Sequence, residues 1–304
     1  MSPESPAYVA IRFATLTGVT LVLGALVFRA IVLRRAMRDG MASDVADIAY
    51  AGATRVGALG IAMLLAAAPL RLAAQYATLG IEGPVDREML AMVITATTWG
   101  KGWLLHVVAI ALGIWVLSRR WPGPSALQTL IAAMPLAIFP ALSGHPAAAS
   151  NFWLEIALDA LHVTGAGAWV GGLAALAIAG IPAALGAGSA ARGTATLALL
   201  RAFSPVALTA FSTLALTGLV VSWIRVGGFA ALRDTPYGHS LLLKVALVAV
   251  LVMIGALNWR RLGPAAGSER GAAALREAMV WELAFGIAVL VVTAVLVARP
   301  PPME

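Results

Sequence analysis

Long apolar runs alternate with short polar segments along almost the whole chain. Each run is long enough to cross the roughly 30 Å hydrocarbon core of a bilayer as a helix. The expected membrane helices, in chain order, are Tyr8–Leu33, Arg55–Leu79, Trp99–Leu117, Ala126–Leu142, Phe152–Ile178, Phe203–Ile224, Ser240–Trp259 and Met279–Ala298. No linker between them is long enough to hold a soluble domain. The pattern predicts an all-α polytopic membrane protein, a bundle of eight transmembrane helices that forms one transmembrane domain over residues 1–304.

Prolines interrupt two of these runs. Pro69 lies inside the second run, and the short fourth run carries Pro135 and Pro140. Because proline removes a backbone donor and clashes with the preceding turn, both helices are expected to bend.

Composition agrees with a membrane protein and excludes several kinds of site. Hydrophobic residues make up 61% of the chain and charged residues 12%, about half the charged fraction of a soluble domain. The absence of cysteine excludes disulfides, thiolate metal sites and covalent c-type haem attachment. The net charge of +7 comes from arginines clustered at the ends of apolar runs. We therefore expect the lipid bilayer, and no nucleic acid, as the partner of this charge.

The arginines also predict the orientation. The odd-numbered loops hold most of them, including the doublets Arg34–Arg35, Arg119–Arg120 and Arg260–Arg261. Cytoplasmic loops of membrane proteins carry the excess of arginine and lysine. The odd loops are therefore expected in the cytoplasm, with both termini on the outer side of the membrane.

The fifth run carries a polar stripe inside an apolar helix. At about 100° per residue, Glu155, Asp159, His162 and Trp169 fall on one narrow face. Ionisable side chains at membrane depth are costly unless something binds them. A second histidine, His145, lies in the short loop before this helix. The stripe indicates either a metal site or a polar seam between helices, in which His162 bonds a neighbour and the acids face water.

All four histidines fall in the half of the molecule that this topology places outside. His145 and His239 lie in external loops, whereas His106 and His162 lie two or three turns into their helices from the outer end. His106 follows Trp99 and Trp103 at helical spacing, and its candidacy as a ligand rests on its depth and face. The inner half has arginines and Glu282, which is expected to form a structural ion pair with Arg201 or Arg55.

No nucleotide-binding loop, HExxH or GxSxG motif occurs in the chain. Nothing therefore indicates ATP-driven or hydrolytic chemistry, and we do not expect an enzyme.

Five segments together resemble the CopD family of copper-resistance membrane proteins. They are SGH at residues 143–145 with DALHVTGAGAWVGG at 159–172, RAFSP at 201–205, TPYGHSLLLK at 235–244, GALNWRRLGP at 255–264 and WE at 281–282. Their order matches along most of the chain, most strongly from residue 143 to residue 298. The resemblance implies a multi-pass protein of the bacterial inner membrane that handles copper from the periplasm, often beside a small periplasmic copper carrier.

With this resemblance, the histidine stripe is interpreted as a copper site. His145 and His162 are the expected principal ligands, with Asp159, Glu155 or His106 completing the shell. Imidazole binds Cu(I) and Cu(II) alike and carboxylates favour Cu(II), so the oxidation state of the copper ion stays open. The expected function is copper import from periplasm to cytoplasm. Two alternatives stay open: a b-type haem cytochrome that uses His106 and His162 as axial ligands, and a copper-insertion factor for a membrane oxidase.

Overall fold

The computed structural model describes residues 4–79, 85–119, 125–142, 151–261 and 269–302. Within these ranges the chain forms helices and no strand, which confirms the all-α prediction. The elements are α1 (Pro6–Val27), η1 (Phe28–Val32), α2 (Leu33–Arg38), α3 (Ser43–Ala77), α4 (Arg87–Ala96), α5 (Thr98–Leu117), α6 (Ala126–Leu142), α7 (Phe152–Ala166), η3 (Gly167–Gly171), α8 (Gly172–Ala175), η4 (Leu176–Gly180), α9 (Ile181–Gly186), α10 (Ser189–Val226), α11 (Phe229–Asp234), α12 (Pro236–Arg261) and α13 (Glu269–Ala298).

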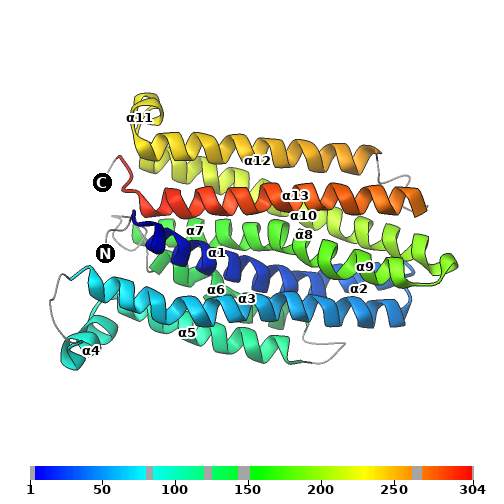
Figure 1. Ribbon diagram of the computed structural model, residues 1–304, viewed down its shortest axis with the longest axis horizontal. Coiled ribbons are helices and arrows are strands. Elements are labelled where there is room, and N and C mark those ends of the chain that lie inside the picture. Colours follow the sequence, from blue (N-terminus) through cyan, green and yellow to red (C-terminus); the bar gives the residue numbers. More distant parts are fainter. Residues whose placement is uncertain (1–3, 80–84, 120–124, 143–150, 262–268, 303–304) are drawn as a thin grey trace.

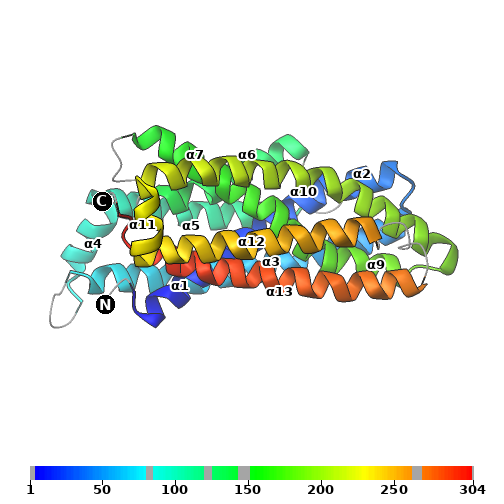
Figure 2. The same ribbon diagram turned by 90° about the horizontal axis from the view of Figure 1, so that it is seen from above.

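The long helices run side by side in an elongated bundle (Figures 1 and 2). Both chain termini lie at one end, together with the short helices α4 and α11 (Figure 1). We call this the terminal end. The opposite end carries α2 and α9, and we call it the basic end after Arg34, Arg35 and Arg38 of α2. The termini thus share one end of the bundle, as the alternation of arginine-rich loops requires.

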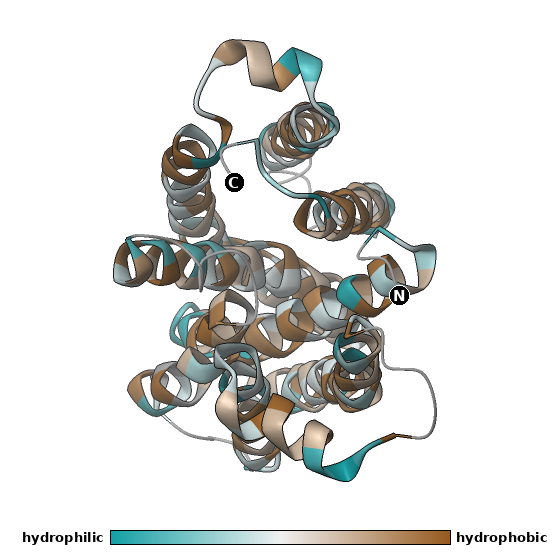
Figure 3. Cartoon of the chain, turned by 90° about the vertical axis from the view of Figure 1, so that its left-hand side faces the viewer, coloured by the Kyte–Doolittle hydropathy of each residue, from teal (hydrophilic) through white to brown (hydrophobic). Residues whose placement is uncertain are grey.

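Seven helical stretches among the described residues are long and apolar enough to cross a membrane: Pro6–Arg38, Ser43–Ala77, Thr98–Leu117, Phe152–Gly186, Ala191–Val226, Pro236–Arg260 and Ala274–Ala298. They make the chain a multi-pass membrane protein. Seen from the terminal end, apolar residues dominate most of the bundle (Figure 3). The predicted fourth span is helix α6, which has 17 residues and is shorter than the other seven. An eighth crossing and the periplasmic side of the termini remain predictions.

The first span lies at the centre of the bundle. It is 72% buried, compared with 11% for the α10 span, whose apolar side chains face outward. Glycines let the neighbouring helices approach α1 closely: a Cβ at Gly24 would lie 2.0 Å from the carbonyl carbon of Gly171, and a Cβ at Gly18 would lie 2.9 Å from the carbonyl oxygen of Gly60. The glycine-rich stretch of the fifth run is therefore a packing surface, which α1 covers on this side.

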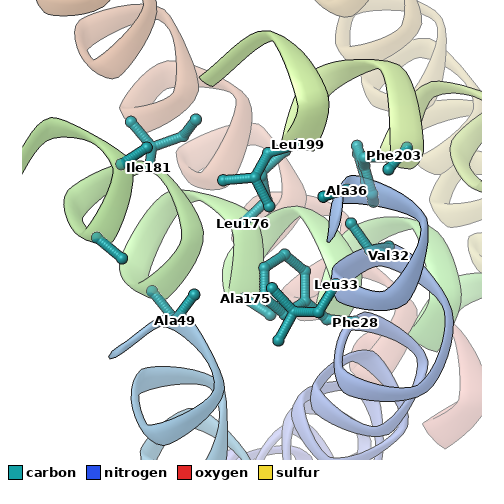
Figure 4. Packing of buried hydrophobic residues seen from close by; sticks show 14 of the residues in the cluster. Phe28, Val32, Leu33, Ala36, Ala49, Ala175, Leu176, Ile181, Leu199 and Phe203 are labelled. Atoms are coloured by element: carbon teal, nitrogen blue, oxygen red, sulfur yellow. The ribbon is translucent and has the colours of Figure 1, made fainter. Parts of the chain in front are cut away.

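Two clusters of buried side chains fill the space around α1. The first surrounds Phe28, Leu176 and Leu199 and joins η1, η4 and α10 (Figure 4). The second contains Leu64 and Phe139 and joins α1, α3, α5 and α6. The first span, Pro6–Arg38, contributes to the first cluster through η1 and α2 and to the second through α1, so it connects the two halves of the chain.

The irregular turns of the helices lie away from the prolines, and the bends expected in the second and fourth runs stay predictions. Helix α3 continues without a break through Pro69, and α6 is one helix from Ala126 to Leu142. Instead, π-helical turns interrupt the first span at η1 and the fifth run at η3 and η4. Such turns insert an extra residue and rotate the side chains that follow, and they often occur at functional sites.

A buried arginine lies within the first π-helical turn. Arg29 is 4% exposed, and its guanidinium donates to the carbonyl oxygens of Leu117 (3.2 Å) and Arg119 (2.8 Å) at the C-terminus of α5 and to the hydroxyl of Tyr50. The Tyr50 hydroxyl donates to the same Arg119 carbonyl at 2.6 Å, and its ring lies 4.0 Å from the guanidinium carbon. The last carbonyls of a helix carry partial negative charge. They stabilise this buried cation, and the arginine in turn caps α5.

Candidate metal site

The polar stripe of the fifth run faces α10. Three of its residues contact that helix in antiparallel order: Glu155 with Arg225 (carboxylate oxygen to Nη2, 3.6 Å), His162 with Thr217 (Nδ1 to Oγ1, 2.9 Å) and Trp169 with Phe211 (ring centroids 5.3 Å apart). Gly165 lies between them and lets the helices come together, because a Cβ there would be 3.1 Å from the Ala210 carbonyl oxygen. These contacts lie on one face of the helix, which packs closely against α10. We call this row of contacts the α7–α10 seam.

Two acids and two bases gather in the part of the seam that lies nearest the terminal end. Asp159, one turn after Glu155, interacts electrostatically with Arg225 of α10 and with Lys244 of α12. The Glu155 and Arg225 side chains are 11% and 13% exposed. The formal charges of these four side chains sum to zero. Charged groups at membrane depth are kept by such mutual pairing, so the cluster joins three helices at the terminal end.

His162 lies directly beneath this cluster. At 1.5 Å per residue it is about 15 Å along the helix from Phe152, which places it well inside the bundle from the terminal end. Its ring bonds Thr217, and it rests on the backbone of α10 at Gly218, where a Cβ would be 3.3 Å from Cε1. Both cations of the cluster also act on it electrostatically. The histidine and Asp159 thus share one environment formed by α7, α10 and α12.

His106 belongs to a different environment. Its side chain is fully buried on α5 and packs on Phe139 of α6, with ring centroids 3.8 Å apart. Its charged neighbour is Arg71 of α3. Within the part of the chain that the structure describes, neither ring nitrogen has a hydrogen-bond partner. The described contacts of His106 therefore lie with α3 and α6, whereas those of His162 lie with α10 and α12.

The two remaining histidines, His145 and His239, lie in loops or at helix ends along the sequence. His145 lies outside the described residues, so its predicted approach to His162 stays a prediction. His239 is exposed at the terminal end, where Nε2 contacts the carbonyl oxygen of Arg233 in α11. Among the residues that the structure describes, no three histidine, aspartate or glutamate side chains come close enough to hold a metal ion. His162, Asp159 and Glu155 therefore do not form a three-ligand metal site by themselves.

Glu282 does not form the expected ion pair. Its carboxylate accepts a hydrogen bond from the amide of Asn258 on α12. Arg55 and Arg201, the expected partners, are exposed on the surface of their helices. The prediction failed because it matched the depth of the residues along their helices without knowing which helix faces α13.

Several residues of the site were not found from the sequence. Arg225 and Thr217 are the partners of the stripe, yet each lies more than fifty residues away along the chain. One signal was present: Thr209, Thr213 and Thr217 recur every four residues and give α10 a polar face within an apolar helix. Arg29, an arginine inside the first apolar run, was a similar signal of a buried polar contact, in this case away from the seam.

Comparison with known proteins identifies a family. Residues 197–296 match the family described as copper resistance protein D, and residues 2–152 match the N-terminal domain of copper resistance protein D-like proteins. The first match contains α12 and the part of α10 that forms the seam, and the second contains α1, α3, α5 and α6. The chain belongs to the copper resistance protein D family. The expected resemblance is thereby confirmed.

Two relatives share long stretches with this family member. Copper resistance protein D of Pseudomonas syringae pv. tomato is 27% identical over 317 residues, which cover 99% of each chain. Copper transport protein CutJ of Bacillus subtilis (strain 168) is 29% identical over 268 residues, or 82% of this chain and 45% of CutJ. The chain thus spans less than half the length of CutJ. No solved structure matches the chain.

Proposed function

We propose that this protein binds copper ions at His162 near the terminal end of the bundle and passes them inward across the membrane. It acts as a binding and transport protein and not as an enzyme. The observation that carries the proposal is the place of His162: an imidazole inside a membrane span, one turn from Asp159, in a chain of the copper resistance protein D family. The names of its two relatives, one of copper resistance and one of copper transport, support copper as the ion.

The charges of the seam determine what a copper ion at His162 would have to displace. The two acids are already compensated by Arg225 and Lys244. A copper ion at His162 would compete with these bases for Asp159, because a metal bound to imidazole attracts the nearest carboxylate. Asp159 is therefore the proposed second ligand, and Glu155 stays with Arg225 unless the cluster rearranges. His145 is the proposed further ligand, and His106 is the least favoured of the candidates because α5 and α6 enclose it.

The proposed direction is from periplasm to cytoplasm. The positive-inside rule places the basic end in the cytoplasm, which puts the terminal end, with His162 and Asp159, on the periplasmic side of the inner membrane. A membrane potential that is negative inside favours inward movement by about 2.3 kcal/mol per charge per 100 mV. Glu282 and Asn258 are the polar groups that a cation would meet further in. A small periplasmic carrier is the proposed source of the copper.

Copper binding by the purified protein tests the site. Alanine at His162 or at His145 should abolish tight copper binding, because each removes a proposed ligand. Alanine at His239 should leave the affinity unchanged, since this side chain is exposed and contacts α11. All three variants are compared with the unmodified protein in the same detergent, by competition against a chelator for Cu(I) and by direct titration for Cu(II).

The pattern of results decides among the functions. Equal binding by the His162→Ala variant and the unmodified protein would overturn the site. Tight binding without any copper flux would favour the insertion-factor alternative, in which metal is held for delivery and not transported.

A further inference from the structure

We infer that Thr217 is a positioning residue for the metal site: its hydroxyl holds the His162 ring with the proton on Nδ1, so that Nε2 presents its lone pair to the metal. The inference rests on the proposed copper function of His162. It adds a residue of α10 to the site and assigns which ring nitrogen binds.

The direction of the hydrogen bond follows from the number of protons on Thr217. A threonine hydroxyl has one hydrogen to donate. The Thr217 oxygen lies 2.7 Å from the carbonyl oxygen of Thr213 and 3.3 Å from that of Leu214, and both of these atoms can only accept. The hydroxyl hydrogen is therefore used within α10. Towards His162 Nδ1, at 2.9 Å, the oxygen acts as acceptor and the ring nitrogen as donor.

This assignment fixes the chemistry of the other nitrogen. A neutral imidazole carries one N–H, so a proton on Nδ1 leaves the lone pair on Nε2. A metal-ligating histidine commonly donates its second ring N–H to an oxygen acceptor, which sets the tautomer and orients the ring. Thr217 is 5% exposed, so no bulk water replaces it in this role.

Packing restricts the ring as well. A Cβ on Gly218 would lie 3.3 Å from Cε1 of His162, so the glycine next to Thr217 provides space for the ring. Gly165, on the same helix as His162, brings α10 into range through the close approach to Ala210. Thr217 and Gly218, which are consecutive in α10, thus supply the hydrogen-bond acceptor and the flat contact surface for the His162 ring. With Nδ1 bonded to Thr217, Nε2 points away from it.

The tautomer can be measured without copper. Protein labelled with ¹⁵N at histidine is compared by imidazole NMR with the His162→Ala variant, which identifies the His162 signals. We expect a protonated Nδ1 and an unprotonated Nε2 in the unmodified protein and in Thr217→Ser, which keeps the hydroxyl. Thr217→Val, of nearly the same shape, should lose this preference. A protonated Nε2 in the unmodified protein would overturn the inference.

Copper affinity gives the second readout. Loss of such an outer partner typically weakens metal binding 10- to 100-fold, and this is the loss expected for Thr217→Val, with recovery in Thr217→Ser. Thr209→Val is the matched control: this threonine makes the same bond to the carbonyl four residues back, at 2.9 Å to Pro205, but is exposed. It should bind copper normally and show that removing a threonine from α10 is not itself harmful.

The outcomes separate the two proposals. If the unmodified protein binds no copper, the proposed function fails and Thr217 has no metal site to position. If the unmodified protein binds copper and Thr217→Val binds it equally well, the proposed function stands and the role of Thr217 is overturned.

Discussion

Arg225 of α10 lies 3.6 Å from Glu155 of α7, and this ion pair closes the outer part of the α7–α10 seam. Both side chains are largely buried, and among the described residues the Nη2 and Nε atoms of Arg225 have no hydrogen-bond partner. The contact is thus an attraction between charges and not a bidentate bond. Its value lies in neutralising two ions that the seam would otherwise leave unpaired.

Removing both charges should therefore cost less than the sum of the two single losses. Glu155→Gln and Arg225→Gln should each lower the unfolding midpoint in mild detergent, because each leaves one buried ion without compensation. The double variant should be more stable than the sum of the two losses predicts, with a coupling free energy of about 0.5–3 kcal/mol. Glu155→Gln combined with Arg29→Gln serves as the control pair, and the two losses of stability should add. Additive effects in the Glu155–Arg225 cycle would show that the pair does not stabilise the seam.

Arg29 should be essential for the junction of α1, α3 and α5. Methionine there keeps the volume but leaves the carbonyl oxygen of Leu117 without this donor and removes the cation above the Tyr50 ring. Hydrogen bonds from a charged group are each worth about 1.5–3 kcal/mol, so the unfolding midpoint should fall clearly. Lysine should restore only part of the loss, since it lacks the planar fork of donors. Methionine at the exposed Arg35 is the control, and equal midpoints for the two methionine variants would contradict the assigned role.

The orientation can be tested with single cysteines, because the chain has none of its own. Gly228, before α11 at the terminal end, and Gly188, before α10, both have open space around an added Cβ. If the termini face the periplasm, a membrane-impermeant thiol reagent should label the cysteine at Gly228 in intact cells, and the one at Gly188 only after the membrane is opened. The reverse pattern would place His162 on the cytoplasmic side and exclude import from the periplasm through this site.

The apolar runs located the helices correctly because burial in lipid depends on local composition. They underestimated several lengths: α3 begins at Ser43, twelve residues before the expected Arg55, since a helix can continue into water with side chains such as Asp44 and Asp47 on its surface. The 3.6-residue period likewise identified the stripe of Glu155 and His162 on α7. These are properties of one helix at a time.

The partners of the stripe could not be obtained in this way. Which residue of α10 meets His162 depends on how far two antiparallel helices slide past each other, and the sequence of either helix alone does not contain that distance. The same reason explains why Glu282 contacts Asn258 instead of an arginine. The π-helical turn at η3 was also missed, because the small residues Gly167 and Gly171 permit it without any proline.

The central claim is that copper crosses the membrane through the site at His162. The most direct measurement is copper flux into sealed vesicles that contain the purified protein with the terminal end outside and a copper indicator in the lumen. We predict copper accumulation that increases with an inside-negative potential and is lost in the His162→Ala variant, while His239→Ala retains it. Accumulation no faster than in protein-free vesicles, or the same rate with His162→Ala as with the unmodified protein, would contradict the account.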